Sequence, residues 1–300
     1  MAASDSNPFA AAITACDDDP ATIQRLYDSH RSQRSLQQRA ELLAHDFSHL
    51  RIDQHLFRLE RQPGFRDHRH CLVFWARPPI HTLRLAEELQ RILRDAAPNA
   101  WMMPTYRMHL TTLELAFSKT PEEIADLLAQ LRPAAGQITS YTHSHRARLV
   151  KPRVSYDLSA FAVSWLTAAG EPAASPAPMP PDDRVESRHD DAYTYHHLRR
   201  DLFDLVRDAG VPIASRYQVP SAHITLGRFL DDVDHDTVEK RERWAAAVDG
   251  INRWLETDVW DRPDAEFIGE WVVGHEKGLD LRAGTLWYGG GRTVIMGEGF

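Results

Sequence analysis

The 300-residue sequence is long enough for about two average domains or one large one, and its 43% hydrophobic and 26% charged content is typical of globular proteins. Its 43 acidic and 35 basic residues give a formal net charge of −8, which argues against a protein that wraps long nucleic acid with a basic face. No apolar run approaches the roughly 20 residues of a membrane span. With an acidic start that predicts no leader and only two cysteines, we expect an intracellular protein, cytoplasmic or nuclear, that acts as a monomer.

The first seventy residues predict a tail followed by helices. Residues 1–20 are rich in Ala, Ser and Asp without a period, so we expect a disordered tail. In residues 21–70 apolar side chains recur at helical spacing, with a polar interruption at 31–34. We interpret this part as an N-terminal helical extension with a structural role.

The regular part of the sequence begins at Cys71. A first unit is predicted as strand, helix, strand and helix at 71–76, 80–96, 108–117 and 120 to about 133. The same order recurs at 154–165, 193–209, 222–230 and 236–257. Further strands with a tight turn at residues 289–291 are predicted within 267–298.

The spacing of the two units predicts a duplication. Cys71 precedes His109 by 38 positions, and Phe161 precedes His223 by 36 once residues 167–192 are left out. That segment holds five prolines between positions 171 and 181, and we expect it to be a mobile, Pro-rich insertion. The predicted fold class is α+β, a bilobal arrangement of duplicated strand-helix-strand-helix units with antiparallel sheets facing a central cleft. The first lobe would span 71–150 and the second 151–300.

The most unusual feature of the composition is its 16 histidines. Four of them have Ser or Thr two positions later, namely His30, His109, His223 and His235. His30 lies in a polar, helical segment, and His235 lies among aspartates at a helix start. Only His109 and His223 lie within apolar strands, so these two are the candidates for chemistry.

Alternate residues of a strand share a face of the sheet. The pairs that share a face are His109 with Thr111 and His223 with Thr225. Arg107 would extend the first pair by two positions, and Gly227 would extend the second and leave room for a ligand. A lone histidine in an apolar strand is usually a core residue, but matched positions in a repeated unit favour a functional pair.

A histidine beside a hydroxyl on one face can bind a phosphate, because the hydroxyl and a protonated imidazole both donate hydrogen bonds to its oxygens. Two such half-sites that face each other supply a general base for the attacking water and a general acid for the leaving oxygen. Imidazole titrates near neutral pH, so both roles are accessible without a metal or cofactor.

At these residues the sequence resembles the two-histidine (2H) phosphoesterase superfamily, which includes 2′-5′ RNA ligase-like proteins and cyclic nucleotide phosphodiesterases. Its signature is a hydrophobic-His-hydrophobic-Thr/Ser-hydrophobic motif in each lobe of a bilobal α+β fold. The motif around His223 and Thr225 matches in full. The motif around His109 and Thr111 has Thr112 where an apolar residue is expected. The resemblance covers roughly residues 70–298.

The resemblance implies metal-independent chemistry on 2′,3′-cyclic phosphates or 2′-5′ linkages. The histidines would be the acid and the base, and the threonines would bind phosphate. It also implies that His223 activates water while His109 protonates the leaving oxygen.

Other residues are secondary candidates. Arg107 and Arg216 are candidates for phosphate binding, with a solvated surface role as the alternative. Tyr217, Trp287 and Tyr288 are candidates for stacking on a base, with core packing as the alternative. His68 with His70 and His143 with His145 have a spacing suited to a metal, but we interpret all four as surface residues.

The sequence therefore predicts a phosphodiesterase that opens a cyclic phosphate on a small nucleotide or an RNA end. The alternatives are a 2′-5′ RNA ligase or phosphodiesterase at the same site, a non-catalytic RNA-end or nucleotide-binding module, and a metallohydrolase that uses other histidines. The acidic composition favours a small or terminal substrate over a long RNA.

Overall fold

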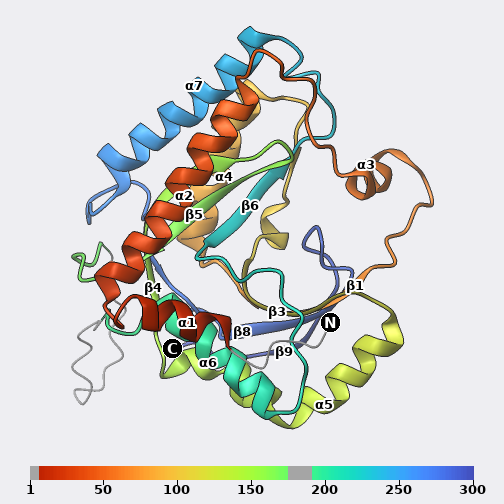
Figure 1. The fold of residues 1–300 in the computed structure, drawn as a ribbon, viewed down its shortest axis with the longest axis vertical. Helices are drawn as coiled ribbons and strands as arrows, with labels where there is room; N and C mark the ends of the chain where they lie inside the picture. Colours follow the sequence, from red (N-terminus) through yellow and green to blue (C-terminus); the bar gives the residue numbers. More distant parts are fainter. Residues whose placement is uncertain (1–6, 175–190) are drawn as a thin grey trace.

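The computed structural model describes residues 7–174 and 191–300. Its longer helices are α1 (Pro8–Ala15), α2 (Pro20–Leu42), α3 (Gln54–Arg61), α4 (Ile80–Ala96), α5 (Pro121–Thr139), α6 (Tyr195–Asp208) and α7 (Val238–Trp254). Its strands are β1 (His70–Ala76), β2 (Trp101–Met102), β3 (Leu110–Lys119), β4 (Arg148–Tyr156), β5 (Ala160–Thr167), β6 (Ala222–Arg228), β7 (Trp271–Val272), β8 (Leu279–Gly284) and β9 (Arg292–Met296). Helices combined with an antiparallel sheet confirm the α+β class (Figure 1).

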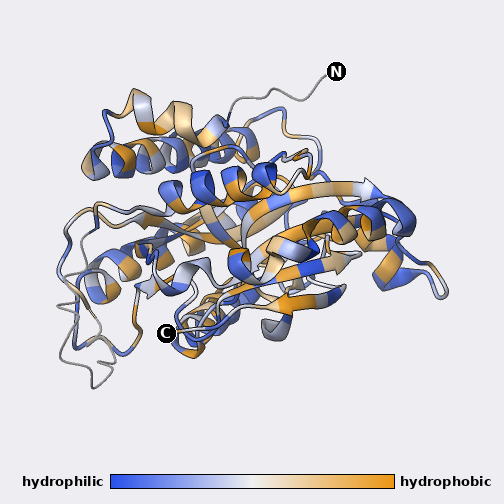
Figure 2. Cartoon of the chain, turned by 90° about the horizontal axis from the view of Figure 1, so that it is seen from below, coloured by the Kyte–Doolittle hydropathy of each residue, from blue (hydrophilic) through white to orange (hydrophobic). Residues whose placement is uncertain are grey.

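The strands form one sheet in the order β7-β4-β5-β6-β3-β1-β8-β9, with β2 paired to β6. The two halves of this order meet where β3 pairs with β6, and Leu110 opposite Ile224 is the register pair that joins them. The helices in Figure 2 carry both hydrophobic and hydrophilic residues, as helices that cover a sheet do. For example, α4 buries Leu85, Leu89 and Leu93.

The C-terminal strands belong to the first half of the sheet, so the expected assignment of all of 151–300 to the second lobe is wrong. Strand β8 pairs with β1 from Cys71 opposite Gly284 to Ala76 opposite Leu279, and β9 pairs with β8. The apolar pattern of 279–296 predicts strands but carries no information about their partner, because pairing of distant strands is set by tertiary packing.

Two predicted element boundaries are also wrong. The expected strand at 154–165 is the hairpin of β4 and β5, which turns where the Asp157 carboxylate accepts hydrogen bonds from Ser159 and Ala160. Helix α5 continues past Pro133 to Thr139, because Ala135 and Ile138 pack in the core and hold the last turns helical.

The N-terminal segment is not a disordered tail over residues 8–15, where helix α1 forms. Asn7 caps this helix by accepting a hydrogen bond from the Phe9 backbone N–H, and Pro8 occupies its first turn. Phe9 is fully buried, and its ring lies 4.2 Å from the Arg199 guanidinium of α6. The buried residues Phe9 and Ile13 stand among small residues without a clear period, so the sequence pattern did not indicate a helix here.

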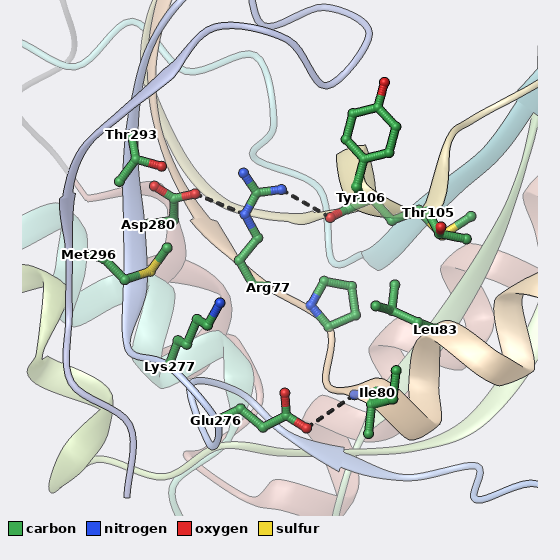
Figure 3. Close-up of a pocket in the computed structure, with 12 residues that line it drawn as sticks. Arg77, Ile80, Leu83, Thr105, Tyr106, Glu276, Lys277, Asp280, Thr293 and Met296 are labelled. Carbon is green, nitrogen blue, oxygen red and sulfur yellow. Dashed lines mark hydrogen bonds and ion pairs between the residues drawn. The ribbon is translucent and has the colours of Figure 1, made fainter.

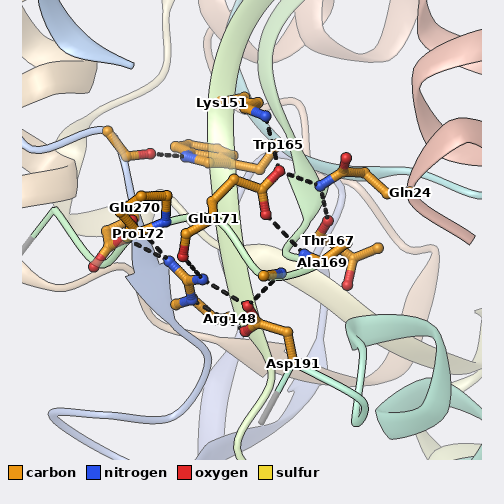
Figure 4. A network of polar contacts seen from close by, with 12 residues as sticks. Gln24, Arg148, Lys151, Trp165, Thr167, Ala169, Glu171, Pro172, Asp191 and Glu270 are labelled. Atoms are coloured by element: carbon orange, nitrogen blue, oxygen red, sulfur yellow. Dashed lines mark hydrogen bonds and ion pairs between the residues drawn. The ribbon is translucent and has the colours of Figure 1, made fainter. Parts of the chain in front are cut away.

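An ion-pair network fixes the chain on both sides of residues 175–190 (Figure 4). The Arg148 guanidinium binds Asp191 at 2.6 Å and Glu270 at 2.9 Å. The Glu171 carboxylate accepts hydrogen bonds from Lys151 and from Gln24 of α2. Most of the Pro-rich insertion expected at 167–192 lies outside the described residues, but its two ends are held to the sheet.

Of the helices in 7–174 and 191–300, none combines the length and the apolar character that a membrane crossing requires.

Replacement of Phe9 with Ala tests whether α1 is part of the folded core. We expect the Phe9→Ala variant to lose about 3–5 kcal/mol of unfolding free energy in urea, because a fully buried ring is removed. The matched control, Thr14→Ala on the exposed face of the same helix, should change stability by less than about 0.5 kcal/mol. Equal stabilities of the two variants would show that the segment is a tail.

Candidate active site

The two His-Thr pairs lie on neighbouring antiparallel strands at the junction of the two halves. Because Leu110 pairs with Ile224, continuing the register by one residue places His109 opposite Thr225 and Thr111 opposite His223. Leu110 and Ile224 are buried on one face of the sheet, whereas the four His and Thr side chains of the motifs are partly exposed on the other. The structure therefore brings all four predicted site residues to one face of the sheet.

This register relates the two motifs by an approximate two-fold axis through the Leu110–Ile224 pair. Diagonal neighbours on two antiparallel strands are about 7–8 Å apart, and directly opposite residues are about 4.5–5.5 Å apart. The two imidazoles are diagonal neighbours, and each threonine lies directly opposite the histidine of the other motif.

His109 is held in one orientation by two contacts. Its Nδ1 lies 2.8 Å from the backbone oxygen of Arg107, and because a carbonyl only accepts, Nδ1 carries the proton. The ring stacks on Trp75 with centroids 3.6 Å apart and an interplanar angle of 15°. In the neutral ring Nε2 is therefore the nitrogen with a free lone pair.

His223 has a different partner. Its Nδ1 lies 3.0 Å from the Ser221 hydroxyl, which can either donate or accept a hydrogen bond. The Tyr217 ring lies beside the imidazole, with centroids 6.3 Å apart. The loop that carries these neighbours is fixed by Arg199, whose guanidinium donates hydrogen bonds to the backbone oxygens of Tyr217 and Val219.

The environment keeps both imidazoles neutral in the free protein. The pKa of His109 is lowered to about 3, mainly by burial and also by the nearby charges of Arg77 and His223, while the bond to the Arg107 carbonyl opposes the shift. The pKa of His223 is lowered to about 4, mainly by burial and also by the Arg199 guanidinium. The effect of His223 on the pKa of His109 is consistent with their diagonal placement.

The two motif threonines have hydroxyl groups available for a ligand. Within residues 7–174 and 191–300, neither the Thr111 nor the Thr225 hydroxyl makes a hydrogen bond to the protein. Thr112, the residue that departs from the family pattern, points to the buried face, where its hydroxyl lacks a partner among the described residues. The departure therefore affects the core and leaves the open face of the strand unchanged.

A cavity of about 370 Å³ opens beside the second motif. Its lining includes His223, Thr225, Tyr217 and Arg216 from the second half of the chain, and His30 and Arg34 from helix α2. This volume lies within the range of small-molecule sites. The N-terminal extension, expected to be only structural, contributes part of this wall.

Arg216 lines the cavity but is already paired. Its guanidinium donates to both oxygens of the buried Glu114 carboxylate, at 2.7 and 3.2 Å. The guanidinium also lies 4.0 Å from the Phe117 ring and 4.4 Å from the Trp287 ring. Its predicted phosphate role stays a prediction, and its observed role is to fix the loop that carries Tyr217.

The stacking candidates differ in their surroundings. Tyr217 borders the cavity, whereas Trp287 lies between the guanidinium groups of Arg216 and Arg69. Tyr288 is only 6% exposed and donates a hydrogen bond to Asp53, so the expectation that it stacks on a base is wrong in this structure. Its ring is a core residue, as the alternative interpretation had it.

Two expectations about the strand faces are also wrong. Arg107 belongs to a 3-10 turn (Thr105–Arg107) that precedes β3, so it does not continue the face of His109 by strand alternation. Gly227 does not leave room for a ligand. A Cβ there would lie 2.3 Å from the Phe161 ring and 2.5 Å from the Trp101 backbone oxygen, so the glycine allows close packing.

Sequence reasoning missed Trp75, Arg34 and Arg228 as site residues. Trp75 appeared only as part of an apolar strand, and Arg34 appeared as part of a polar interruption in a helix. Arg228 follows the second motif closely, so its nearness in sequence was a usable signal. No local pattern indicates the helix α2 contribution, because α2 reaches the cavity through tertiary packing.

The remaining histidines lie in other environments. His235 is fully buried against Phe229 and Trp244, and His145 stacks on Tyr141. Among the residues that the structure describes, no group of three or more His, Cys, Asp or Glu side chains is arranged to hold a metal ion.

A second hollow of about 370 Å³ lies at the end of β1, where Arg77 and Asp280 line it (Figure 3). At its centre the Arg77 guanidinium donates to the buried Asp280 carboxylate at 2.8 Å and to the Met108 backbone oxygen at 3.3 Å. The same guanidinium lies 5.0 Å from the Trp75 ring. This ion pair therefore fixes both the residue before His109 and the ring on which His109 stacks.

Comparisons with known proteins find similarity among solved structures. No protein-family model matches the chain, and no curated protein sequence matches it. Among solved structures, Usb1 of Kluyveromyces marxianus is similar with a TM-score of 0.36 and 14% sequence identity, over 77% of this chain and 97% of that one.

The two lowered pKa values predict an acid-dependent loss of stability. The pKa of each of these imidazoles is lower in the folded protein than in the unfolded chain. As the pH falls below about 6.5, the unfolded chain therefore binds more protons than the folded protein. We expect the unfolding free energy of the wild type, relative to a His109→Asn/His223→Asn double variant, to be highest above pH 7 and to fall towards pH 4. A difference that stays constant over this range would contradict the burial of the imidazoles.

Proposed function

We propose that this protein is a phosphodiesterase that hydrolyses 2′,3′-cyclic phosphates of nucleotides or RNA ends by two-histidine acid–base catalysis, without a metal or cofactor. The observation that carries the proposal is the antiparallel register, which supports two His-Thr half-sites on either side of one phosphate. Adjacent imidazoles with free Thr hydroxyls match the needs of displacement at phosphorus, where the attacking and leaving oxygens lie on opposite sides.

The differing partners of the two imidazoles support a division of roles. The carbonyl that accepts from Nδ1 of His109 stabilises the imidazolium form, which suits the general acid. His223, with a hydroxyl at Nδ1, suits the general base. A bound phosphate anion between the rings favours protonation of one imidazole, since an opposite charge raises the pKa of a histidine.

The reaction then proceeds as a single displacement. His223 takes a proton from water as the water oxygen forms a bond to phosphorus. The bond from phosphorus to one ribose oxygen breaks, and His109 gives its Nε2 proton to that oxygen, leaving a nucleoside monophosphate end. Thr111 and Thr225 donate hydrogen bonds to the non-bridging oxygens, which carry the developing charge.

Single substitutions at the two histidines test the proposal directly. We expect His109→Ala and His223→Ala each to lower the turnover of 2′,3′-cyclic nucleotides by about 10²–10⁴-fold, the usual contribution of a general acid or base. The control His45→Ala, at an exposed histidine away from the cavity, should keep wild-type activity. Wild-type turnover should persist in EDTA.

The alternatives give different results in the same assays. Binding of a cyclic nucleotide without turnover would indicate a binding module. Loss of turnover in EDTA would indicate a metallohydrolase. Full activity of both histidine variants would overturn the proposal.

The pH dependence of kcat/KM provides a separate test. A substrate molecule reacts only with the form of the free protein in which one imidazole is protonated and the other is neutral. Because both pKa values are lowered, this singly protonated form is scarce at neutral pH. A cyclic phosphodiester does not titrate in this range. We therefore expect kcat/KM to fall by about tenfold per unit as the pH rises from 6 to 8. A flat profile over that range would contradict the proposed acid.

A further inference from the structure

Arg228 is turned toward the catalytic face by an irregularity in strand β6. Along the pairing of β5 with β6, Phe161 lies opposite Gly227 but Ala162 lies opposite Thr225, so Leu226 is an extra residue in β6. A bulge of this kind shifts the alternation of faces by one residue. Arg228 therefore shares the face of Thr225, and its side chain lines the same cavity.

Arg228 is also a charged group without a hydrogen-bond partner. Its side chain is 22% exposed, and in the described part of the chain its Nη1 forms an ion pair with Oδ2 of Asp53 at 3.7 Å, which is beyond hydrogen-bond distance. The buried Nε has no hydrogen bond at all among the described residues. The other oxygen of this carboxylate, Oδ1, accepts hydrogen bonds from the Tyr288 hydroxyl and from the His55 N–H at the start of helix α3. Because the ion pair with Asp53 is longer than a hydrogen bond and Nε is unbonded among the described residues, the Arg228 guanidinium can still donate to an anion in the cavity.

A second cation reaches the cavity from the N-terminal extension. Arg34 of α2 lines its wall and is 57% exposed, with Asp157 at 3.0 Å as its partner. The positive charges of Arg34 and Arg228 both lower the pKa of His223, whereas Asp157 raises it. Both guanidinium groups therefore lie within electrostatic range of the catalytic histidine.

We propose that Arg228 and Arg34 form a second anion subsite, which binds a phosphate on the 5′ side of the nucleoside whose cyclic phosphate is opened. Arg228 is one strand repeat beyond Thr225, about 7 Å along β6. A nucleoside spans this distance between its 3′ and 5′ phosphates. The inference rests on the proposed function, and it narrows the substrate to a nucleotide that carries two phosphates, either a 5′-phosphorylated mononucleotide or the last nucleotide of an RNA.

Binding measurements test the subsite without requiring turnover. By calorimetry, the wild type should bind adenosine 3′,5′-bisphosphate about tenfold or more tightly than adenosine 3′-monophosphate, since a charge-assisted contact is added. Arg228→Gln and Arg34→Gln should each reduce this preference, and their melting temperatures establish that they fold. The control Arg39→Gln, on the same helix but outside this cavity and paired with Asp249, should keep it.

Kinetics separate this inference from the proposed function. The ratio of kcat/KM for a 5′-phosphorylated nucleoside 2′,3′-cyclic phosphate over its unphosphorylated form should exceed about ten and fall in both arginine variants. A dinucleotide with a terminal cyclic phosphate as third substrate distinguishes an RNA end from a free nucleotide. A wild type that hydrolyses all three equally would overturn the subsite and leave the proposed function intact. Absence of turnover together with a retained binding preference would overturn the proposed function and leave the subsite intact.

Discussion

The register of β3 against β6 is the constraint on which the rest of the site depends. Leu110 opposite Ile224 joins the two halves of the sheet and buries one apolar residue from each. Because side chains alternate, this one pair sends both histidines and both threonines to the opposite face. A slip of β6 by one residue against β3 would move His223 and Thr225 into the core and separate them from His109 and Thr111. The apolar pair and the reactive face are therefore two consequences of one pairing.

The surrounding structure serves to hold this face in place. Trp75 and Arg77 support His109 from the first half of the sheet, and Asp280 of β8 fixes Arg77. On the other side Arg199 ties the loop that carries Tyr217, and Phe9 of α1 covers Arg199. Helices at the start of the chain thus stabilise the site although they carry neither motif. Burial of the imidazoles follows from this packing, and the lowered pKa values follow from the burial.

Local patterns were enough to predict the α+β class, most helices and strands, and the shared face of the two His-Thr pairs. They succeeded because alternation within a strand is a property of a few adjacent residues. They failed where distant contacts decide the outcome. Nothing near residues 279–296 indicates that β8 pairs with β1, and the buried anchor Phe9 stands among small residues. Arg228 was missed because one extra residue, Leu226, reverses the expected face.

Local charges in the cavity allow an acidic protein to provide the proposed anion subsite. The net charge of −8 belongs to the whole surface, whereas Arg34 and Arg228 act locally beside His223. Each of these arginines and Arg216 is paired with a carboxylate, but Arg216 binds the buried Glu114 through two nitrogens, whereas Arg34 and Arg228 each pair through one. An arrangement of this kind suits a short ligand with a few phosphates more than an extended polymer.

The most direct test of the account is the position of a bound phosphate. In a crystal structure with a nucleoside 3′-monophosphate, the account predicts one phosphate within hydrogen-bond distance of Nε2 of both His109 and His223, with the hydroxyls of Thr111 and Thr225 on its other oxygens. A phosphate bound elsewhere, for example in the hollow beside Arg77, with the two imidazoles free, would contradict it.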